Sequence, residues 1–255
     1  MSIPYWRMQV KVCLLVGVVL AVVYPERGSA REILPLCSSV LDALKREAKL
    51  REVATAVFGP NPAYVQDDDL TRACVFPVAA LEYPDARVLI VGSVPGALYP
   101  ITEARLSAFF LRPMSGTLRL VTVRRDFASS GSGMGNVGKI TAIHFGDDEG
   151  IMIAADSNGQ GYDQGSVAFY LFRKEGIVSL GTIPTSFSDG GAVDDPGKET
   201  HVDGNVEVGK PRADLIRVVY SIRRNGKTRQ QPVIWGPKNG KFVPVSGAIP
   251  KELNR

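Results

Sequence analysis

Histidine, cysteine and tryptophan are scarce in this chain, which has two, three and two of them among 255 residues. Two histidines leave little material for a Ser-His-Asp triad, and neither a G-x-S-x-G turn nor an H-E-x-x-H motif occurs. Three cysteines are too few for a disulfide-dense scaffold or a four-thiolate zinc cluster. These absences argue against the common hydrolases and against a structural zinc site.

Long apolar runs are also missing, apart from one uncharged run of twelve residues at 12–23. A membrane-spanning helix needs about 20 apolar residues, so this run is short for a span. Basic residues precede the run, and the small residues Gly28 and Ala30 follow it at the spacing of a cleavage site. This order predicts a secretory signal peptide over residues 1–30, with an uncleaved N-terminal anchor as the alternative. No span is expected after cleavage.

Two cysteines remain after cleavage, Cys37 and Cys74. An exported protein meets an oxidising compartment, where an even pair of cysteines is expected to form one disulfide. Closing a loop of this size stabilises the fold by about 4 kcal/mol in the chain-entropy account. The sequence therefore predicts a periplasmic or secreted protein of the bacterial envelope, with its N-terminal segment tied to the following region.

The net charge is only +4, but the charges are unevenly distributed. Residues 144–208 carry twelve acidic and three basic side chains, and residues 209–255 carry two acidic and eleven basic ones. One interpretation is that the two stretches lie side by side and neutralise each other. The other is a basic surface for an anionic partner. Nucleic acid is not expected, because the net charge is small and no aromatic residues alternate with the basic ones.

Residues 38–58 have the pattern of one amphipathic helix. Ser39 followed by Asp42 resembles a capping box, and Gly59-Pro60 ends the pattern. Its apolar residues are expected on or near one face, and they are Val40, Leu41, Leu44, Ala48, Val53 and Val57.

The rest of the chain has the pattern of short strands separated by Gly, Asn, Asp and Pro. Asn225-Gly226 and Asn239-Gly240 are hairpin turns of the primed type, and a further hairpin is expected at Glu175-Gly176. Residues 186–209 are expected to form a long polar loop. The predicted strands are 87–91, 106–112, 117–124, 139–145, 151–155, 167–173, 177–183, 214–223, 232–235 and 241–245.

These patterns predict a mainly β fold, an antiparallel meander that forms a sandwich or partly closed barrel with one N-terminal helix packed on it. The expected division is a signal peptide at 1–30, a helical segment at 31–75 that a disulfide links to the β region, and a β-rich domain at 76–255.

Two features are candidate contact surfaces. The turn at 159–165 is rich in glycine and presents Tyr162, which either contacts a partner or covers the edge of the core. The predicted hairpin around Asn225-Gly226 has the densest positive charge, which either binds an anionic surface or protects a sheet edge from aggregation. Its four cations are Arg223, Arg224, Lys227 and Arg229.

The segment 156–161 resembles the opening of a calcium-binding loop. Asp156 and Asn158 supply oxygen ligands at every second position, and Asp163 adds a carboxylate. The segment departs from the pattern because Val167 stands at the twelfth position in place of glutamate. A glycine-rich β-turn without metal is therefore the alternative to a Ca²⁺ site.

Taken together, the sequence predicts an exported, non-catalytic β-rich protein that binds an envelope protein or an anionic glycan, with no resident cofactor. It carries no signal for an oligomeric state. The alternative is a carbohydrate-active hydrolase, which would use two carboxylates. The acids available to it are Asp147, Asp148, Asp156, Asp163 and Asp189.

Overall fold

The computed structural model describes residues 35–65, 73–94, 103–130, 137–193 and 198–254. The chain divides into two compact units, residues 1–32 and 33–255, and the fold below is that of the second. The predicted signal peptide lies outside the described residues.

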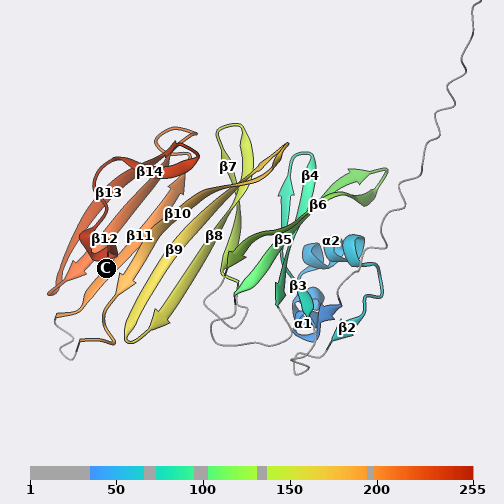
Figure 1. The fold of residues 1–255 in the computed structure, drawn as a ribbon, viewed down its shortest axis with the longest axis horizontal. Coiled ribbons are helices and arrows are strands. Elements are labelled where there is room, and N and C mark those ends of the chain that lie inside the picture. Colours follow the sequence, from blue (N-terminus) through green and yellow to red (C-terminus); the bar gives the residue numbers. More distant parts are fainter. Residues whose placement is uncertain (1–34, 66–72, 95–102, 131–136, 194–197, 255) are drawn as a thin grey trace, which may run out of the picture. The chain divides into compact units, whose positions relative to one another are not determined.

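Two sheets make up most of the second unit (Figure 1). The six-stranded sheet has the order β2-β1-β3-β4-β5-β6 and the eight-stranded sheet the order β14-β13-β12-β11-β10-β9-β8-β7. Pairing is antiparallel except where β1 meets β2 and β3. The strands are β1 (Leu36–Cys37), β2 (Tyr64–Val65), β3 (Cys74–Tyr83), β4 (Ala86–Val94), β5 (Ala104–Met114), β6 (Thr117–Ser130), β7 (Lys139–Phe145), β8 (Asp148–Gly159), β9 (Tyr162–Arg173), β10 (Gly176–Ser188), β11 (Thr200–Val208), β12 (Ile216–Arg224), β13 (Lys227–Lys238) and β14 (Lys241–Ser246).

The mainly β, antiparallel meander predicted from the sequence is confirmed, since strands β3 to β6 and β7 to β14 pair in chain order. Tight hairpins make this order possible. Asn225 and Gly226 have φ of 51° and 69°, and Asn239 and Gly240 have φ of 52° and 75°, as primed turns require. The β9–β10 hairpin is also present, with Arg173 paired to Gly176, so its turn lies one residue earlier than expected.

The single helix predicted over residues 38–58 is wrong. The segment forms a 3-10 turn η1 (Ser38–Val40) and two helices, α1 (Leu41–Arg46) and α2 (Ala48–Phe58), separated by Glu47 in an extended conformation. The first helix is capped at Val40 rather than Ser39. At about 100° per residue, Leu44 and Val53 would point in opposite directions on one straight helix. The break lets both side chains join the same apolar cluster.

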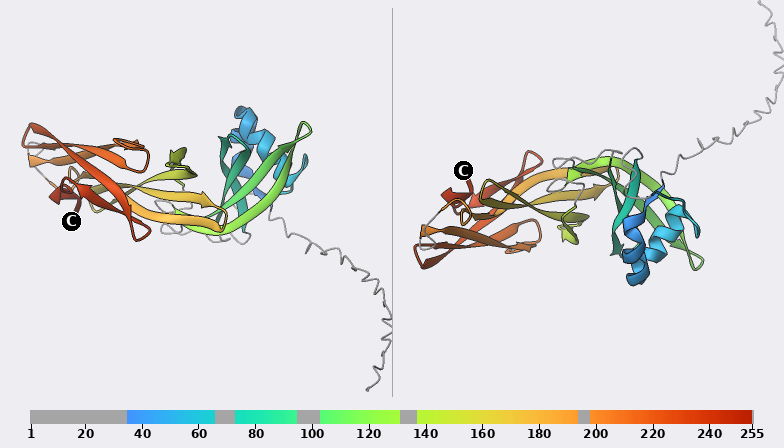
Figure 2. Two further views of the ribbon diagram at one scale, coloured as in Figure 1. Left: turned by 90° about the horizontal axis from the view of Figure 1, so that it is seen from above. Right: turned by 90° about the horizontal axis from the view of Figure 1, so that it is seen from below.

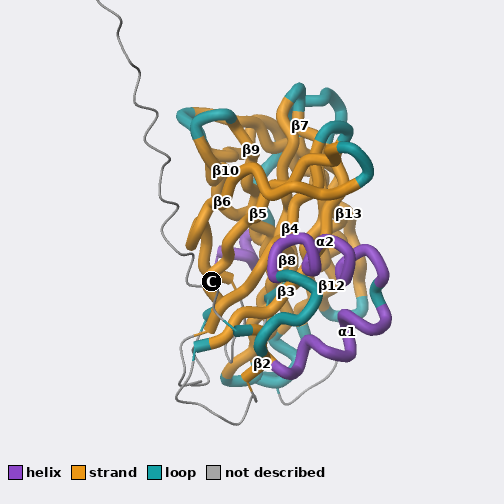
Figure 3. Tube along the Cα trace, turned by 90° about the vertical axis from the view of Figure 1, so that its right-hand side faces the viewer, coloured by secondary structure: helices purple, strands orange, loops and turns teal. Residues whose placement is uncertain are grey.

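The two helices cover one face of the six-stranded sheet, and they lie in front of its strands in Figure 3. Strand β4 shows how the sheet is buried on both faces. Leu89 and Val91 pack with the helices, while Val88 and Ile90 pack toward the eight-stranded sheet. This two-residue alternation is the consequence of the strand geometry.

The disulfide Cys37–Cys74 is confirmed, with a Cα–Cα distance of 5.1 Å. It joins β1 to β3, which are neighbours in the six-stranded sheet. Since β1 pairs with β3 and the predicted boundary at residue 75 falls within β3, the N-terminal segment shares a sheet with the β region.

The two sheets pack in a sandwich-like arrangement through aromatic side chains. Phe110 of β5 and Phe172 of β9 have ring centroids 5.1 Å apart, and the Tyr83 hydroxyl of β3 donates a hydrogen bond of 2.6 Å to the Gly150 carbonyl of β8. Strand β9 is covered on both faces, as its apolar sequence predicts. Phe172 faces the six-stranded sheet, whereas Phe169 and Leu171 face a second apolar core, which the eight-stranded sheet forms by itself.

The eight-stranded sheet folds back on itself (Figure 2). Phe145 lies in β7 and Phe242 in β14, the two edge strands, yet their ring centroids are 5.1 Å apart. Phe169 lies at the same distance from Phe242 and is fully buried. The C-terminal turn η3 (Lys251–Asn254) packs on the same core through Leu253.

The long polar loop predicted over residues 186–209 is wrong. Strand β10 continues to Ser188, and β11 occupies residues 200–208. In β11 the valines Val202, Val206 and Val208 pack into the core, while charged or polar residues alternate with them. Because half of its residues face outward, the overall polarity of the segment concealed its two-residue period.

Candidate functional site

The two candidate contact surfaces lie at the same end of the eight-stranded sheet. Because the strands are antiparallel, the β8–β9 turn, the β10–β11 connection and the β12–β13 turn gather there. We call this the Tyr162 end. The glycines Gly161 and Gly191 bring two of these segments into contact, since a Cβ on either one would overlap with the other's backbone.

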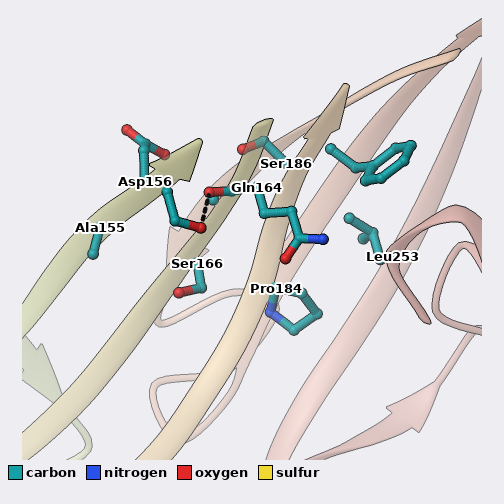
Figure 4. Close-up of a pocket in the computed structure, with 10 residues that line it drawn as sticks. Ala155, Asp156, Gln164, Ser166, Pro184, Ser186 and Leu253 are labelled. Atoms are coloured by element: carbon teal, nitrogen blue, oxygen red, sulfur yellow. Dashed lines mark hydrogen bonds between the residues drawn. The ribbon is translucent and has the colours of Figure 1, made fainter. Parts of the chain in front are cut away.

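A polar depression of about 270 Å³ lies at the Tyr162 end (Figure 4). The register places Ser157 opposite Gln164, and Gln164 opposite Phe187, so three strands contribute to one surface. Ser166 and Pro184 continue it along β9 and β10. In Figure 4 the Gln164 amide points toward Leu253, whereas Asp156 and Ser186 point away toward the top. The lining thus offers hydroxyl and amide groups and the Asp156 carboxylate beside an apolar wall.

Tyr162 lies beside Phe187, one of the residues that line this depression. Its ring lies 6.1 Å from that of Phe187, with the planes 32° apart, and 42% of the residue remains exposed. It therefore covers the core edge with one part and leaves another part open to a partner. The cover of the core edge is observed, and contact of the exposed part with a partner stays a prediction.

The basic hairpin is present, but its cations are divided between two faces. Arg224 lies opposite Lys227, and Arg229 lies opposite Ile222, on the face that carries Phe187. Arg223 lies opposite Thr228 on the other face. Three of the four cations therefore share a face with the depression, and one does not.

The electrostatic roles of these cations differ. Arg229 donates a 2.7 Å hydrogen bond to Gln231 Oε1 and lies 3.9 Å from Glu252 Oε1, a carboxylate only 3% exposed. Arg224 and Lys227 are exposed and form no ion pair within the described part of the chain. Arg229 is thus a structural contact, and the other two are available to an anion.

The C-terminal turn η3 joins the depression to the basic hairpin. Its Glu252 is next to Arg229, and the following residue, Leu253, lines the depression. At the Tyr162 end, the turn η3 therefore separates the Tyr162 ring and the polar depression from the exposed cations Arg224 and Lys227.

The proposed calcium ligands lie on β-strands. Asp156 and Asn158 belong to β8, and Asn158 lies opposite Asp163 of β9 across a two-residue turn. Alternate residues of an extended strand are about 7 Å apart, whereas ligands of one Ca²⁺ must converge within about 2.6 Å of it. Among the residues described, no three His, Cys, Asp or Glu side chains gather as a metal site.

The acids of the hydrolase alternative fall in three places. Asp148 holds Arg173 by a 3.0 Å hydrogen bond, and Asp147 is beside it at the end of the sheet opposite Tyr162. Asp189 is buried and accepts a 2.6 Å hydrogen bond from the Thr200 amide. The remaining two, Asp156 of β8 and Asp163 of β9, are exposed, and Asp156 lines the depression.

His144 is a sheet residue, opposite Glu149 in the β7–β8 pair. Burial raises the pKa of Glu149, the neighbouring His144 lowers it, and the nearby charge of Asp85 raises it. His201, expected in a loop, lies in β11 between Ser188 and Arg223.

Asp156, which the sequence singles out as a calcium ligand, lines the depression, but the sequence does not indicate its neighbours there, Ser157, Gln164, Ser166 and Pro184. Each is ordinary in its own strand, and only the register of β8, β9 and β10 brings them together. No described helix has the length and apolar character needed to cross a membrane. Comparison with protein-family models, with curated proteins and with solved structures found no match to this chain.

Proposed function

We propose that this protein is an exported, non-catalytic β-rich protein that binds an anionic glycan of the bacterial envelope, in the periplasm or after secretion, at the Tyr162 end of its eight-stranded sheet. The disulfide Cys37–Cys74 fits an oxidising compartment outside the cytoplasm. The order of charged, apolar and small residues before residue 31 supports export.

One observation carries the proposal: unpaired cations share a face with an aromatic ring and a polar depression. Arg224 and Lys227 lie on the same face as Gln164 and Tyr162, separated by the short turn η3. A patch of cations alone would fit edge protection equally well. Protection of an edge requires no polar depression next to the charges.

The chemistry of these groups suits an acidic sugar. Arg and Lys form charge-assisted hydrogen bonds with carboxylate, sulfate or phosphate groups. The Gln164 amide and the Ser157 and Ser166 hydroxyls each donate and accept, as sugar hydroxyls do. Tyr162 adds an amphipathic ring surface. A protein partner, which the sequence left open, would have less use for such a small polar depression.

Binding of dextran sulfate by isothermal titration calorimetry tests the proposal, with neutral dextran as a comparison. We expect binding that weakens as salt rises, because exposed charges are screened. The double charge reversal Arg224→Glu/Lys227→Glu should lower the affinity about tenfold or more. Tyr162→Ala should also weaken binding, which a purely electrostatic contact would not require.

The chain contains a matched control. Lys238 and Lys241 also face each other across an Asn-Gly turn, at the opposite end of β13. Lys238→Glu/Lys241→Glu should leave the affinity unchanged. If both double variants weaken binding equally, the contact is unspecific and the proposal fails. If neither polysaccharide binds, the protein-partner alternative replaces it.

A further inference from the structure

A second depression lies between the two sheets, at the end of β9 opposite Tyr162. It has a volume of about 370 Å³, at the small end of the range for ligand sites. Strands β5 and β6 of the six-stranded sheet form one side, and the β9–β10 turn forms the other. Its lining includes the apolar residues Phe110, Val121 and Ile177 and four basic residues.

The floor of this groove is apolar. Phe110 and Ile177 are partly buried and pack against the core between the sheets. Val121 is the extra residue of a β-bulge, because the register passes from Phe110 opposite Thr122 to Leu111 opposite Leu120. The bulge leaves Val121 56% exposed. An exposed β-branched residue beside an aromatic floor provides a surface for an alkyl chain.

The rim of the groove is cationic. Arg112 and Arg124 come from the six-stranded sheet, and Arg173 and Lys174 from the turn of the other sheet. Arg173 is neutralised by Asp148, but the other three form no ion pair among the described residues.

No acidic residue lines the groove. Asp85 lies close to Arg112 in a neighbouring shallow depression, and Glu175 follows Lys174 in the turn. Arg119 lies directly opposite Arg112, an arrangement of like charges that destabilises a sheet unless an anion intervenes. The positive charge around the groove therefore exceeds the negative charge.

We infer that this groove binds a single-chain amphiphilic anion, an alkyl phosphate of lipid origin. The alkyl chain lies along Phe110, Val121 and Ile177. The phosphate lies at the rim, where Arg112, Arg124 and Lys174 converge from both sheets, since Arg and Lys are the side chains that bind phosphate best. The groove lies at the other end of β9 from the glycan site, so the inference does not rest on the proposed function.

Calorimetric titration of the full chain with dodecyl phosphate, below its critical micelle concentration, tests the inference. Inorganic phosphate supplies the head group alone, and dodecyl maltoside supplies the same chain with an uncharged head. We expect saturable one-to-one binding of dodecyl phosphate, about tenfold or more tighter than either partial probe.

Variants at the rim and at the floor assign the site. Arg124→Gln and Lys174→Gln should each weaken dodecyl phosphate binding about tenfold, the cost of one charge-assisted hydrogen bond. Val121→Thr preserves the shape of an exposed residue and should weaken the contact with the alkyl chain. Lys238→Gln, at the β13–β14 turn and outside the lining of the groove, should have no effect.

Three results would overturn the inference. Equal affinity for inorganic phosphate would mean that the groove binds only the anion. Equal affinity for dodecyl maltoside, or binding of several molecules per chain, would mean unspecific adsorption of the alkyl chain. Unchanged affinity in both Arg124→Gln and Lys174→Gln would place the ligand elsewhere on the protein.

Discussion

Tyr83 connects the two sheets by a buried polar contact, so its replacement by phenylalanine tests how firmly they are joined. The residue is 3% exposed, and its hydroxyl donates a 2.6 Å hydrogen bond to the Gly150 carbonyl of the other sheet. The ring also packs edge to face against Phe172. Tyr83→Phe keeps the ring and removes only the hydrogen bond.

The expected loss at neutral pH is about 1 kcal/mol of the free energy of unfolding, the net value of one buried hydrogen bond. A somewhat larger loss is expected if the Gly150 carbonyl is left without another donor. Urea denaturation of the wild type and the variant measures this difference. Tyr64→Phe, at a residue 41% exposed, is the control and should leave the midpoint unchanged.

The same variant has a signature at alkaline pH. Burial, and to a lesser degree the charge of Glu149, raises the pKa of Tyr83 well above its ordinary value of 10. A raised pKa favours the protonated form in the folded state, so this contribution is complete below pH 10 and is lost as pH rises toward the folded pKa. The wild type should therefore lose about 1.4 kcal/mol per pH unit above pH 10 from Tyr83 alone.

Burial also raises the pKa of Tyr220 to about 12, and it should add a similar loss between pH 10 and 12. Tyr83→Phe should remove its own share of the slope and leave that of Tyr220. An unchanged midpoint at pH 7, together with an unchanged slope above pH 10, would refute the buried contact between the sheets.

Three further variants test other parts of the fold by urea denaturation. Gly161→Ala should cost about 2–4 kcal/mol, because φ is +82° and the new Cβ would overlap with the Gly191 backbone, whereas Gly159→Ala, with open space around it, should cost less than 1 kcal/mol. Equal effects of the two would contradict the contact between the turns. Phe169→Ala should cost about 3–5 kcal/mol, since the ring is fully buried against Phe242, and a loss below 1 kcal/mol would contradict the shared core of the eight-stranded sheet. Cys37→Ala/Cys74→Ala should cost about 4 kcal/mol for a loop of 37 residues, and a loss below 1 kcal/mol would contradict a disulfide that stabilises the fold.

Local patterns predicted much of the fold. The strand at residues 139–145 has the bounds expected from its alternation, and the Asn-Gly pairs turn the hairpins as expected. Both signals are local, because the side-chain period and the positive φ of a primed turn involve only a few neighbouring residues. The disulfide was predictable for a different reason. Once Cys13 is assigned to the predicted signal peptide, the two remaining cysteines allow only one pairing.

The two wrong predictions of secondary structure have one cause. The average polarity of each segment concealed the spacing of its apolar residues along the chain. The polar outward residues of β11 favour the prediction of a loop, although Val202, Val206 and Val208 alternate with them. The frequent apolar residues of 38–58 favour the prediction of one continuous helix, although Leu44 and Val53 occupy different faces at helical spacing.

The candidate sites were only partly predictable. Tyr162 and the basic hairpin were identified separately, but their place at one end of one sheet depends on the order of five strands. The alkyl phosphate groove requires Phe110, Arg124 and Ile177 to meet from two different sheets. Such contacts depend on register and packing, which no single segment of the sequence contains.

The most direct test of the account locates the bound glycan on the protein. Backbone amide chemical shifts of the ¹⁵N-labelled protein should be followed during titration with a sulfated oligosaccharide. We predict that the largest shifts fall on Tyr162, Gln164, Arg224 and Lys227, at one end of the eight-stranded sheet. Shifts centred on the turn at Lys238 and Lys241, or spread evenly over all exposed cations, would contradict a glycan site at the Tyr162 end.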